Sequence, residues 1–210
     1  MTEKTKRYLR KQPLQERSQR MTERILRAAR QLVVNADLPG VGRITTNKVA
    51  KSAGISVGSL YQYFPNIESI FLALYDEMVA PIQQVLREFD SSQYLAMPRE
   101  QFFDEFNRAM TSRGPDSEFV FAMQHATKIY PALLKAEAVH SQLVAATISG
   151  FMRYYGSKWA TDKLERLALY AFYLDFGTWF YRDRVRPKES EVFEWELRTL
   201  NDVFNRAFED

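Results

Sequence analysis

Residues 44–69 restrict what this chain can fold into more than any other part of its sequence. The hydroxyl of Thr45 or Thr46 can cap the first turn of a helix, where backbone amides lack helical partners. Gly54 can adopt a positive φ without the cost that a Cβ imposes, so that helix is expected to end there in a sharp turn. A second helix is then expected to begin at Ser56.

Apolar residues recur in this stretch at the spacing that buries one side of each helix. They are Val49, Ala50, Ala53, Ile55, Leu60 and Phe64. The pattern predicts a helix-turn-helix with the spacing of the DNA-reading form of the motif. A buried helical hairpin with no nucleic-acid role would use the same apolar residues. It would not need the polar residues on the opposite side, which are Ser56, Ser59, Tyr61, Gln62 and Tyr63.

Several short motifs within residues 20–75 occur together in one known family. They are Thr45-Thr46, the turn from Ala50 to Gly54, the run Ser56-Val57-Gly58-Ser59-Leu60-Tyr61-Gln62-Tyr63-Phe64-Pro65, and Asn66-Ile67-Glu68. Together they resemble the DNA-binding domain of TetR/AcrR-type transcriptional regulators. The resemblance implies a regulator that binds double-stranded operator DNA, forms a homodimer and responds to a small molecule. A repressor without catalytic activity or a cofactor is the expected form.

The resemblance also implies which residues contact DNA. Ser56, Val57, Ser59 and Gln62 would face base edges, Tyr61 and Tyr63 would contact phosphates or bases, and Thr45 or Thr46 would contact the DNA backbone. Side-chain chemistry agrees, because a glutamine can bind adenine bidentately and a valine can touch the methyl group of thymine. Gly58 would let the DNA backbone come close.

One residue departs from the family pattern. Ile67 stands where the family commonly has a lysine that holds a phosphate. We expect Lys48, Lys51, Arg43 or the basic N-terminal arm to compensate for that contact.

Charge is distributed unevenly along the chain. The whole sequence has 29 Lys and Arg against 26 Asp and Glu, but residues 1–66 hold 13 basic side chains and 4 acidic ones, which leaves 16 against 22 for residues 67–210. A basic head on an acidic body is typical of a phosphate-binding module fused to another domain. Residues 1–17 are expected to form a flexible basic arm that either tracks DNA or only solubilises the chain.

Helical periodicity extends through the rest of the sequence, without strand-like alternation. Helices are expected over residues 18–37, 45–53, 56–64, 67–89, 98–112, 116–129, 131–155, 160–182 and 188–208. Pro81 lies inside the fourth and should kink it or split it in two. The predicted fold is all-α with about nine helices: a three-helix helix-turn-helix domain at residues 18–66 and a larger helical ligand-binding and dimerisation domain at residues 67–210.

The larger domain is rich in aromatic residues, and rings packed between helices can line a pocket for a flat or acyl-chain molecule. Candidate contacts of a small hydrophobic or aromatic effector are Phe103, Phe106, Met110, Phe121, Gln124, His125, Phe151, Tyr155, Tyr173, Asp175 and Trp179. Core packing is the competing interpretation for each ring. The polar members are more informative, because a buried ionisable group needs a partner.

Two apolar stripes near the C-terminus are candidates for a subunit interface. They include Leu164, Leu167, Ala171 and Thr178 on one helix and Trp195, Thr199, Val203 and Phe204 on the next. The resemblance implies that these helices pair with their copies in a four-helix bundle, so that two heads reach successive major grooves. Burial within one protomer explains part of both stripes equally well.

Other function classes find less support. The chain has no cysteine, which excludes disulfides and thiolate metal sites, and His125 and His140 are too few for a histidine-built zinc site. An enzyme is disfavoured because nucleophile and phosphate-loop motifs are missing. With neither a long apolar run nor a signal peptide, the protein is expected in the cytoplasm. A helical protein-binding adaptor without catalysis is the alternative, and salt-dependent DNA binding would separate it from a regulator.

Overall fold

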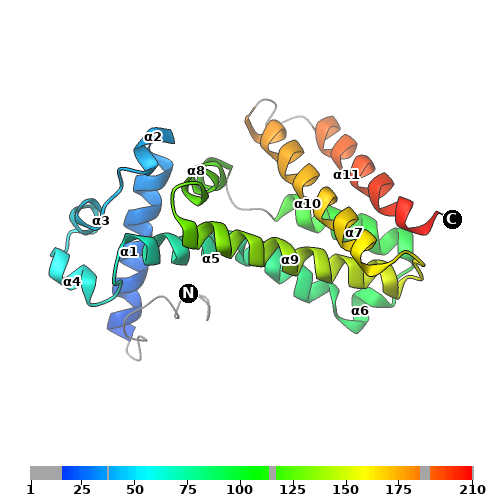
Figure 1. Cartoon of the computed structure of the whole chain (residues 1–210), viewed down its shortest axis with the longest axis horizontal. Helices are drawn as coiled ribbons and strands as arrows, with labels where there is room; N and C mark the ends of the chain where they lie inside the picture. Colours follow the sequence, from blue (N-terminus) through cyan, green and yellow to red (C-terminus); the bar gives the residue numbers. More distant parts are fainter. Residues whose placement is uncertain (1–15, 37, 114–116, 185–189, 210) are drawn as a thin grey trace. The chain divides into compact units, whose positions relative to one another are not determined.

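The computed structural model of this chain describes residues 16–36, 38–113, 117–184 and 190–209, although the side chains of a few helical residues beside the gaps are not described. The described residues form helices joined by short connections, and none of them is in a strand (Figure 1). This confirms the predicted all-α class. Most of the predicted basic arm, residues 1–15, lies outside the described residues.

Nine of the helices correspond to those expected from periodicity. They are α1 (Glu16–Val34), α3 (Thr46–Ser52), α4 (Val57–Tyr61), α5 (Ile67–Phe89), α7 (Arg99–Ser112), α8 (Ser117–Thr127), α9 (Pro131–Tyr154), α10 (Thr161–Arg184) and α11 (Ser190–Asn205). Two single turns were not expected: α2 (Leu38–Val41) and α6 (Ser92–Leu95). The 3₁₀ turn η2 (Arg206–Phe208) lies inside the last predicted helix, residues 188–208. A turn of three or four residues is too short to carry a periodic signal, and tertiary contacts rather than propensity hold it.

Three predicted helix ends were wrong by about one turn. The first helix ends at Val34 rather than 37, α4 ends at Tyr61 rather than 64, and α11 ends at Asn205 rather than 208. Phe64 is nevertheless fully buried, because the backbone after α4 closes a turn in which its amide donates to the carbonyl of Leu60 at 3.0 Å. A buried apolar residue just beyond a helix continues the periodic pattern without continuing the helix.

Pro81 does not split α5, which runs unbroken from Ile67 to Phe89. Proline has no backbone N–H, so the carbonyl of Glu77 lacks its usual helical donor at this point. Packing divides the described chain at the same place. One compact unit contains the residues up to Ala80 together with Glu118–Glu137, and the other contains Pro81–Ser117 and Ala138–Asp210. Helices α5 and α9 each contribute residues to both units.

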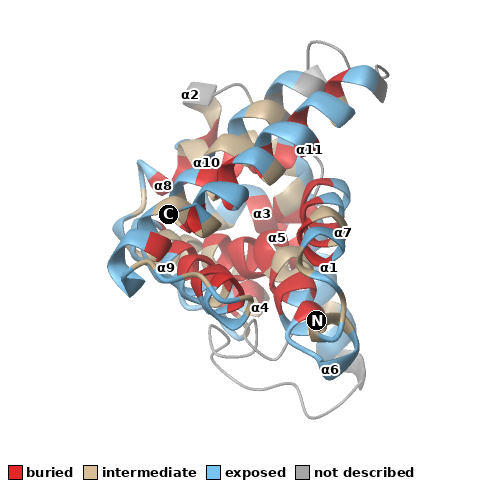
Figure 2. Ribbon diagram, turned by 90° about the vertical axis from the view of Figure 1, so that its right-hand side faces the viewer, coloured by how far each residue is buried: buried red, intermediate tan, exposed pale blue. Residues whose placement is uncertain are grey.

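Each unit has its own apolar core. In the first unit, Ile25 of α1, Val49 of α3 and Leu60 of α4 are completely buried. Contacts to α8 extend this unit, because the Arg30 guanidinium lies 4.0 Å from the ring centre of Phe119. The core of the second unit gathers residues from the end of α5 and from α7, α9, α10 and α11. Figure 2 shows that the long helices carry buried residues along one side and exposed residues along the other.

Candidate nucleic-acid interface

Helix α3 is fixed at both ends by its own sequence. The Thr45 hydroxyl accepts a hydrogen bond from the amide of Lys48 at 3.3 Å, which satisfies one of the unpaired donors of the first turn. At the other end the amide of Ile55 donates to the carbonyl of Ala50 at 3.0 Å. The amide of Gly54 donates to the carbonyl of Lys51 at 3.1 Å. This bond pair is the Schellman motif, which closes a helix through a left-handed residue.

Gly54 is that left-handed residue, with φ at +62°. A side chain at this position would be strained, and its Cβ would lie only 2.8 Å from Nη2 of Arg24. Arg24 reaches over from α1 and donates to the Gly54 carbonyl at 3.4 Å. Sequence patterns could not connect Arg24 to this turn, because the two are 30 positions apart in the chain.

Helix α4 starts where predicted. Ser56 caps it by accepting from the Ser59 amide at 3.0 Å, and the hydroxyls of the two serines are 2.8 Å apart. Leu60 and Phe64 are fully buried and fix which side of α4 faces the core. The hydroxyl of Ser59 is therefore already engaged within the protein, whereas the amide of Gln62 projects from an exposed residue at the end of α4.

The polar side of the motif is accessible to a partner. Thr45, Lys48, Ser56, Gly58, Tyr61 and Gln62 are exposed, and Thr46, Val57, Ser59 and Tyr63 are partly buried. The hydroxyls of Thr46 and Tyr61 lie 3.1 Å apart and join the start of α3 to the end of α4. All ten predicted contact residues thus belong to these two short helices and their ends.

The structure shows no reason why the fold would require a glycine at position 58. Its φ is not positive, and a Cβ built on it would meet only the Ser56 hydroxyl, at 4.0 Å. Glycine inside a helix costs about 1 kcal/mol relative to alanine. A glycine that is unfavourable for the helix and faces open space is expected where another molecule must approach the backbone closely.

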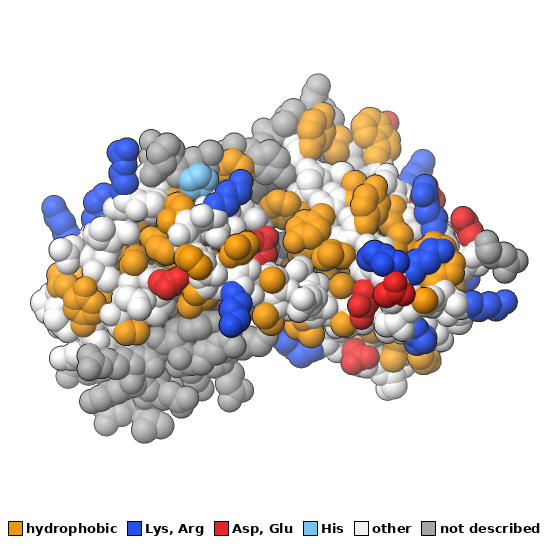
Figure 3. Space-filling model, in the orientation of Figure 1, with side chains coloured by type: hydrophobic (Ala, Val, Ile, Leu, Met, Phe, Trp, Pro, Cys, Tyr) orange, Lys and Arg blue, Asp and Glu red, His pale blue; other side chains and the backbone are white. Residues whose placement is uncertain are grey.

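Helix α5 begins with a reciprocal cap. The side-chain oxygen of Asn66 accepts from the Ser69 amide at 2.8 Å, and the Ser69 hydroxyl donates to the Asn66 carbonyl at 2.7 Å. Ile67 is partly buried and offers no charge to a phosphate. Arg43, Lys48 and Lys51 are exposed in or next to the motif. Figure 3 shows basic side chains on the surface of the first unit. Their compensating role stays a prediction.

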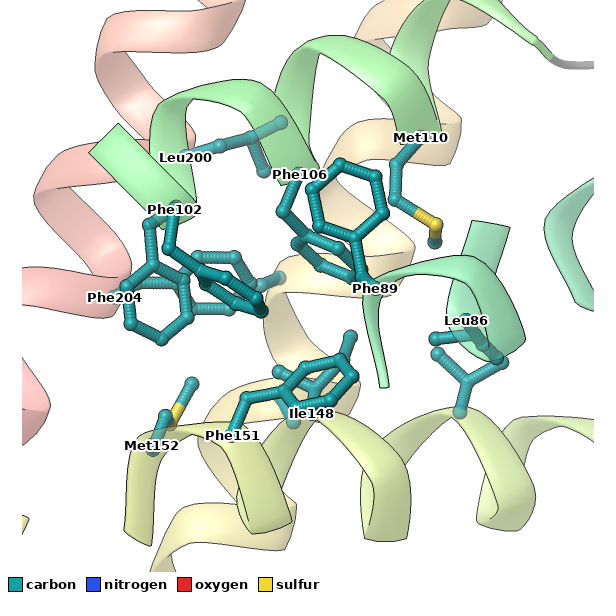
Figure 4. Packing of buried hydrophobic residues seen from close by; sticks show 14 of the residues in the cluster. Leu86, Phe89, Phe102, Phe106, Met110, Ile148, Phe151, Met152, Leu200 and Phe204 are labelled. Atoms are coloured by element: carbon teal, nitrogen blue, oxygen red, sulfur yellow. The ribbon is translucent and has the colours of Figure 1, made fainter. Parts of the chain in front are cut away.

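The predicted effector contacts fall into both compact units. Phe121, Gln124 and His125 are half-buried on α8, in the first unit. Phe103, Phe106, Met110 and Phe151 are buried in the core of the second unit, where the rings of Phe106 and Phe151 meet edge to face at 5.6 Å. Figure 4 shows the labelled rings of this core pointing toward one another from α5, α7, α9 and α11. These four side chains are therefore part of one packed core.

The other predicted effector contacts lie around that core. Tyr155 packs against it, and its hydroxyl is within 3.3 Å of the carbonyls of Leu95 and Met97. Asp175 accepts a hydrogen bond from Thr111 at 2.8 Å, so this carboxylate has a partner in the protein. Tyr173 is exposed, and the side chain of Trp179 lies outside the described part.

The predicted interface residues divide by burial. Leu164, Ala171, Val203 and Phe204 are buried in the core of their own protomer, which accounts for their place in the apolar stripes. Leu167 and Thr178 are partly buried, and Trp195 and Thr199 are exposed. Sequence periodicity could not separate these sets, because residues on adjoining sides of one helix share a broad apolar stripe.

Two further features are absent from the described residues. They contain no cluster of three or more His, Cys, Asp or Glu side chains that could hold a metal ion. Their helices include none long and apolar enough to cross a membrane.

Comparison with known proteins gives the same assignment for the N-terminal helices. Residues 25–74 match the sequence profile of the tetR family of bacterial regulatory proteins. Over 50 residues the chain is 40% identical to the nucleoid occlusion factor SlmA of Haemophilus ducreyi. This stretch is 24% of the chain and spans 23% of that relative's length.

Solved structures are similar over most of the chain. A TetR-family transcriptional regulator from Haemophilus influenzae superposes with a TM-score of 0.59 at 16% identity, covering 90% of this chain and 98% of the other. The TetR-family repressor FadR of Thermus thermophilus, solved in complex with lauroyl-CoA, also has a TM-score of 0.59, at 20% identity, covering 90% and 95%. At these identities the similarity shows a shared fold. Residues 25–74 are therefore a domain of the tetR family of bacterial regulatory proteins, and the chain shares the overall fold of TetR-family regulators.

Proposed function

We propose that this chain represses transcription by binding operator DNA through α3 and α4, and that a small hydrophobic or aromatic effector releases it. The observation that carries DNA binding is the exposed polar side of α4, held in a fixed orientation by buried Leu60 and Phe64. A short, rigidly seated helix with its amide and hydroxyl groups toward solvent fits the major groove. Residues 18–66 form the DNA-binding domain in this proposal, and residues 67–210 bind effector and dimerise.

Base recognition and phosphate contact fall to different residues. Gln62 is exposed and can pair bidentately with adenine, and Val57 at the start of α4 can meet a thymine methyl. Lys48 and the hydroxyls of Thr45, Tyr61 and Tyr63 serve phosphates. Thr46 orients Tyr61 through the contact between their hydroxyls. The hydroxyls of Ser56 and Ser59 already contact each other, so they can bind base edges only through their remaining hydrogen-bonding positions.

Dimerisation would place two such heads on one operator. Exposed aromatic residues support it, because Tyr170, Tyr173 and Tyr181 recur along one side of α10 and Trp195 stands exposed on α11. Helices α10 and α11 pack together. Hydrophobic side chains are visible over α10 in Figure 3. Large exposed aromatic side chains on two helices that pack together are typical of a protein interface. Two linked heads gain affinity without any new contact to DNA.

Effector response is supported by analogy and by continuity of the backbone. The Thermus thermophilus repressor was solved with lauroyl-CoA, a ligand with a long acyl chain. In the present chain α5 and α9 each contribute residues to both compact units. Each helix therefore connects the second unit through its backbone to the first unit, which holds α3 and α4. A ligand shifts DNA affinity only by its differential affinity for the two arrangements, and a coupling of about 1–3 kcal/mol is the expected scale.

Salt-dependent DNA binding tests the proposal and separates it from a protein-binding adaptor. Duplexes selected from a random pool by the full-length protein would be titrated by fluorescence anisotropy at several salt concentrations. The proposal expects log affinity to fall linearly with log salt and expects a selected duplex to bind more tightly than random sequence. A protein that binds neither duplex at low salt would refute it.

A further inference from the structure

The second compact unit contains a cavity that no predicted function uses. Its volume is about 330 Å³, within the range of about 300–1,000 Å³ that small-molecule pockets occupy. The start of α7, the connection between α9 and α10, and the residues around η2 form its walls. Tyr155 is the single residue that this cavity shares with the predicted effector contacts.

Hydrogen bonds hold the walls of the cavity in place. The Ser157 hydroxyl donates to the carbonyl of Ala207 and so joins the α9–α10 connection to η2. The Tyr155 hydroxyl lies near the backbone carbonyls that precede α7. Gly156 lines the cavity at φ +93°, and a Cβ built on it would meet nothing within 4 Å. These hydrogen bonds join the walls of the cavity to one another within the protein.

The lining combines aromatic rings with two cations. Trp159 and Phe208 supply rings, and Arg99 and Lys158 supply positive charge, against one carboxylate at Glu209. The Arg99 guanidinium lies 4.4 Å from the ring centre of Phe208, which orients it. Such a lining favours a flat ligand with one negative charge over a neutral ligand, and Glu209 disfavours a second negative charge.

Arg99 retains capacity to bind an anion. Its Nη2 contacts Glu100 at 2.6 Å, but the Glu100 side chain is 70% exposed, and an ion pair so close to water contributes little. Its buried Nε has no hydrogen-bond partner among the described residues. A planar guanidinium that is oriented by a ring and only weakly paired matches the two oxygens of a carboxylate.

We propose that this cavity binds an aromatic monocarboxylate, with the carboxylate on Arg99 and Lys158 and the ring against Trp159 and Phe208. The proposal goes beyond the DNA-binding function and does not depend on it, because the binding is expected in the absence of DNA. Inorganic phosphate should bind poorly, since it is not flat and carries more charge than this lining balances.

Isothermal titration of the full chain with benzoate tests the site. Benzamide serves as the uncharged probe and cyclohexanecarboxylate as the non-aromatic one. We expect benzamide and inorganic phosphate to bind at least about tenfold more weakly than benzoate, and cyclohexanecarboxylate several-fold more weakly. No heat with benzoate at millimolar concentration would overturn the proposal, as would equal binding of benzamide or phosphate.

Variants then locate the site. Arg99→Gln and Lys158→Gln should each weaken benzoate binding about tenfold. Lys158 is exposed on a connection, so this second variant keeps the test valid if Arg99→Gln does not fold. Arg166→Gln is the matched control, because Arg166 pairs with Asp162 on α10 and does not line the cavity. Undiminished binding by folded Arg99→Gln and Lys158→Gln proteins would overturn the assignment to this cavity.

Discussion

Two glycines of the helix-turn-helix differ in what they do. Gly54 is required by the backbone, because it alone in the motif adopts a left-handed φ and completes the Schellman bonds after α3. Gly58 is not required by any contact in the fold. The pair therefore allows the demands of folding and those of DNA binding to be measured separately by the same substitution.

Gly54→Ala should lower the free energy of unfolding by about 1–2 kcal/mol, because an L-residue in the left-handed region carries that cost. The new Cβ would also displace Arg24 from the Gly54 carbonyl. Urea unfolding followed by circular dichroism measures the change. An unchanged unfolding midpoint would mean that the turn relaxes without cost.

Gly58→Ala should instead raise the free energy of unfolding by about 0.4–1 kcal/mol, since it reduces the entropy of the unfolded chain at a position with room for a methyl group. It should also weaken DNA binding, because in the proposed complex the methyl group would stand where the DNA backbone comes close. The two effects have opposite signs, so loss of folding cannot imitate loss of binding. DNA affinity equal to that of the parent protein would contradict the close approach.

At the scale of elements, sequence patterns predicted helices well where side chains have a strong local preference. The first helix of the motif was expected to start at Thr45 or Thr46 and the second at Ser56, because a short polar side chain can satisfy orphan amides locally, and the structure has caps at Thr45 and Ser56. Helix ends were less predictable, because Phe64 continues the apolar spacing of α4 from a turn. Periodicity records that a residue is buried, and it does not record whether the backbone there is still helical.

The candidate sites outside the motif were harder to predict for a related reason. Phe106 was a candidate for an effector pocket and Phe204 for a subunit interface, with core packing as the alternative for each, and both are buried in one core. A core, a pocket and an interface all select apolar rings at helical spacing. Only the arrangement of several helices distinguishes them. Tyr170 and Tyr181 became candidates for a subunit interface only when the structure showed that they are exposed.

Pro81→Ala should stabilise the protein by up to about 3 kcal/mol, because it restores the helical donor that the carbonyl of Glu77 lacks. Pro98→Ala is the control, since Pro98 is the N-cap residue of α7 and replaces no helical hydrogen bond. Thermal unfolding of both variants gives the comparison. If Pro81→Ala lowered the melting temperature, the proline ring would contribute packing that outweighs the missing bond.

At the scale of the whole molecule, the proposed regulator requires two protomers. Trp195→Glu should weaken self-association by about 2 kcal/mol or more, because a charge would replace a large exposed aromatic residue. Sedimentation equilibrium measures this directly. Phe204→Glu should instead destabilise the protomer itself, since Phe204 is only 2% exposed within its own core. A parent protein that stays monomeric at micromolar concentration would contradict the dimer.

Recognition of DNA by α4 is the central claim, and anisotropy titrations of two variants test it most directly. On a selected duplex Gln62→Ala should cost about 1–3 kcal/mol while random-sequence binding stays nearly unchanged. Lys48→Ala should weaken binding to both duplexes and reduce the slope of log affinity against log salt by about one. Equal losses on both duplexes for a folded Gln62→Ala protein would show that α4 does not read bases as proposed here.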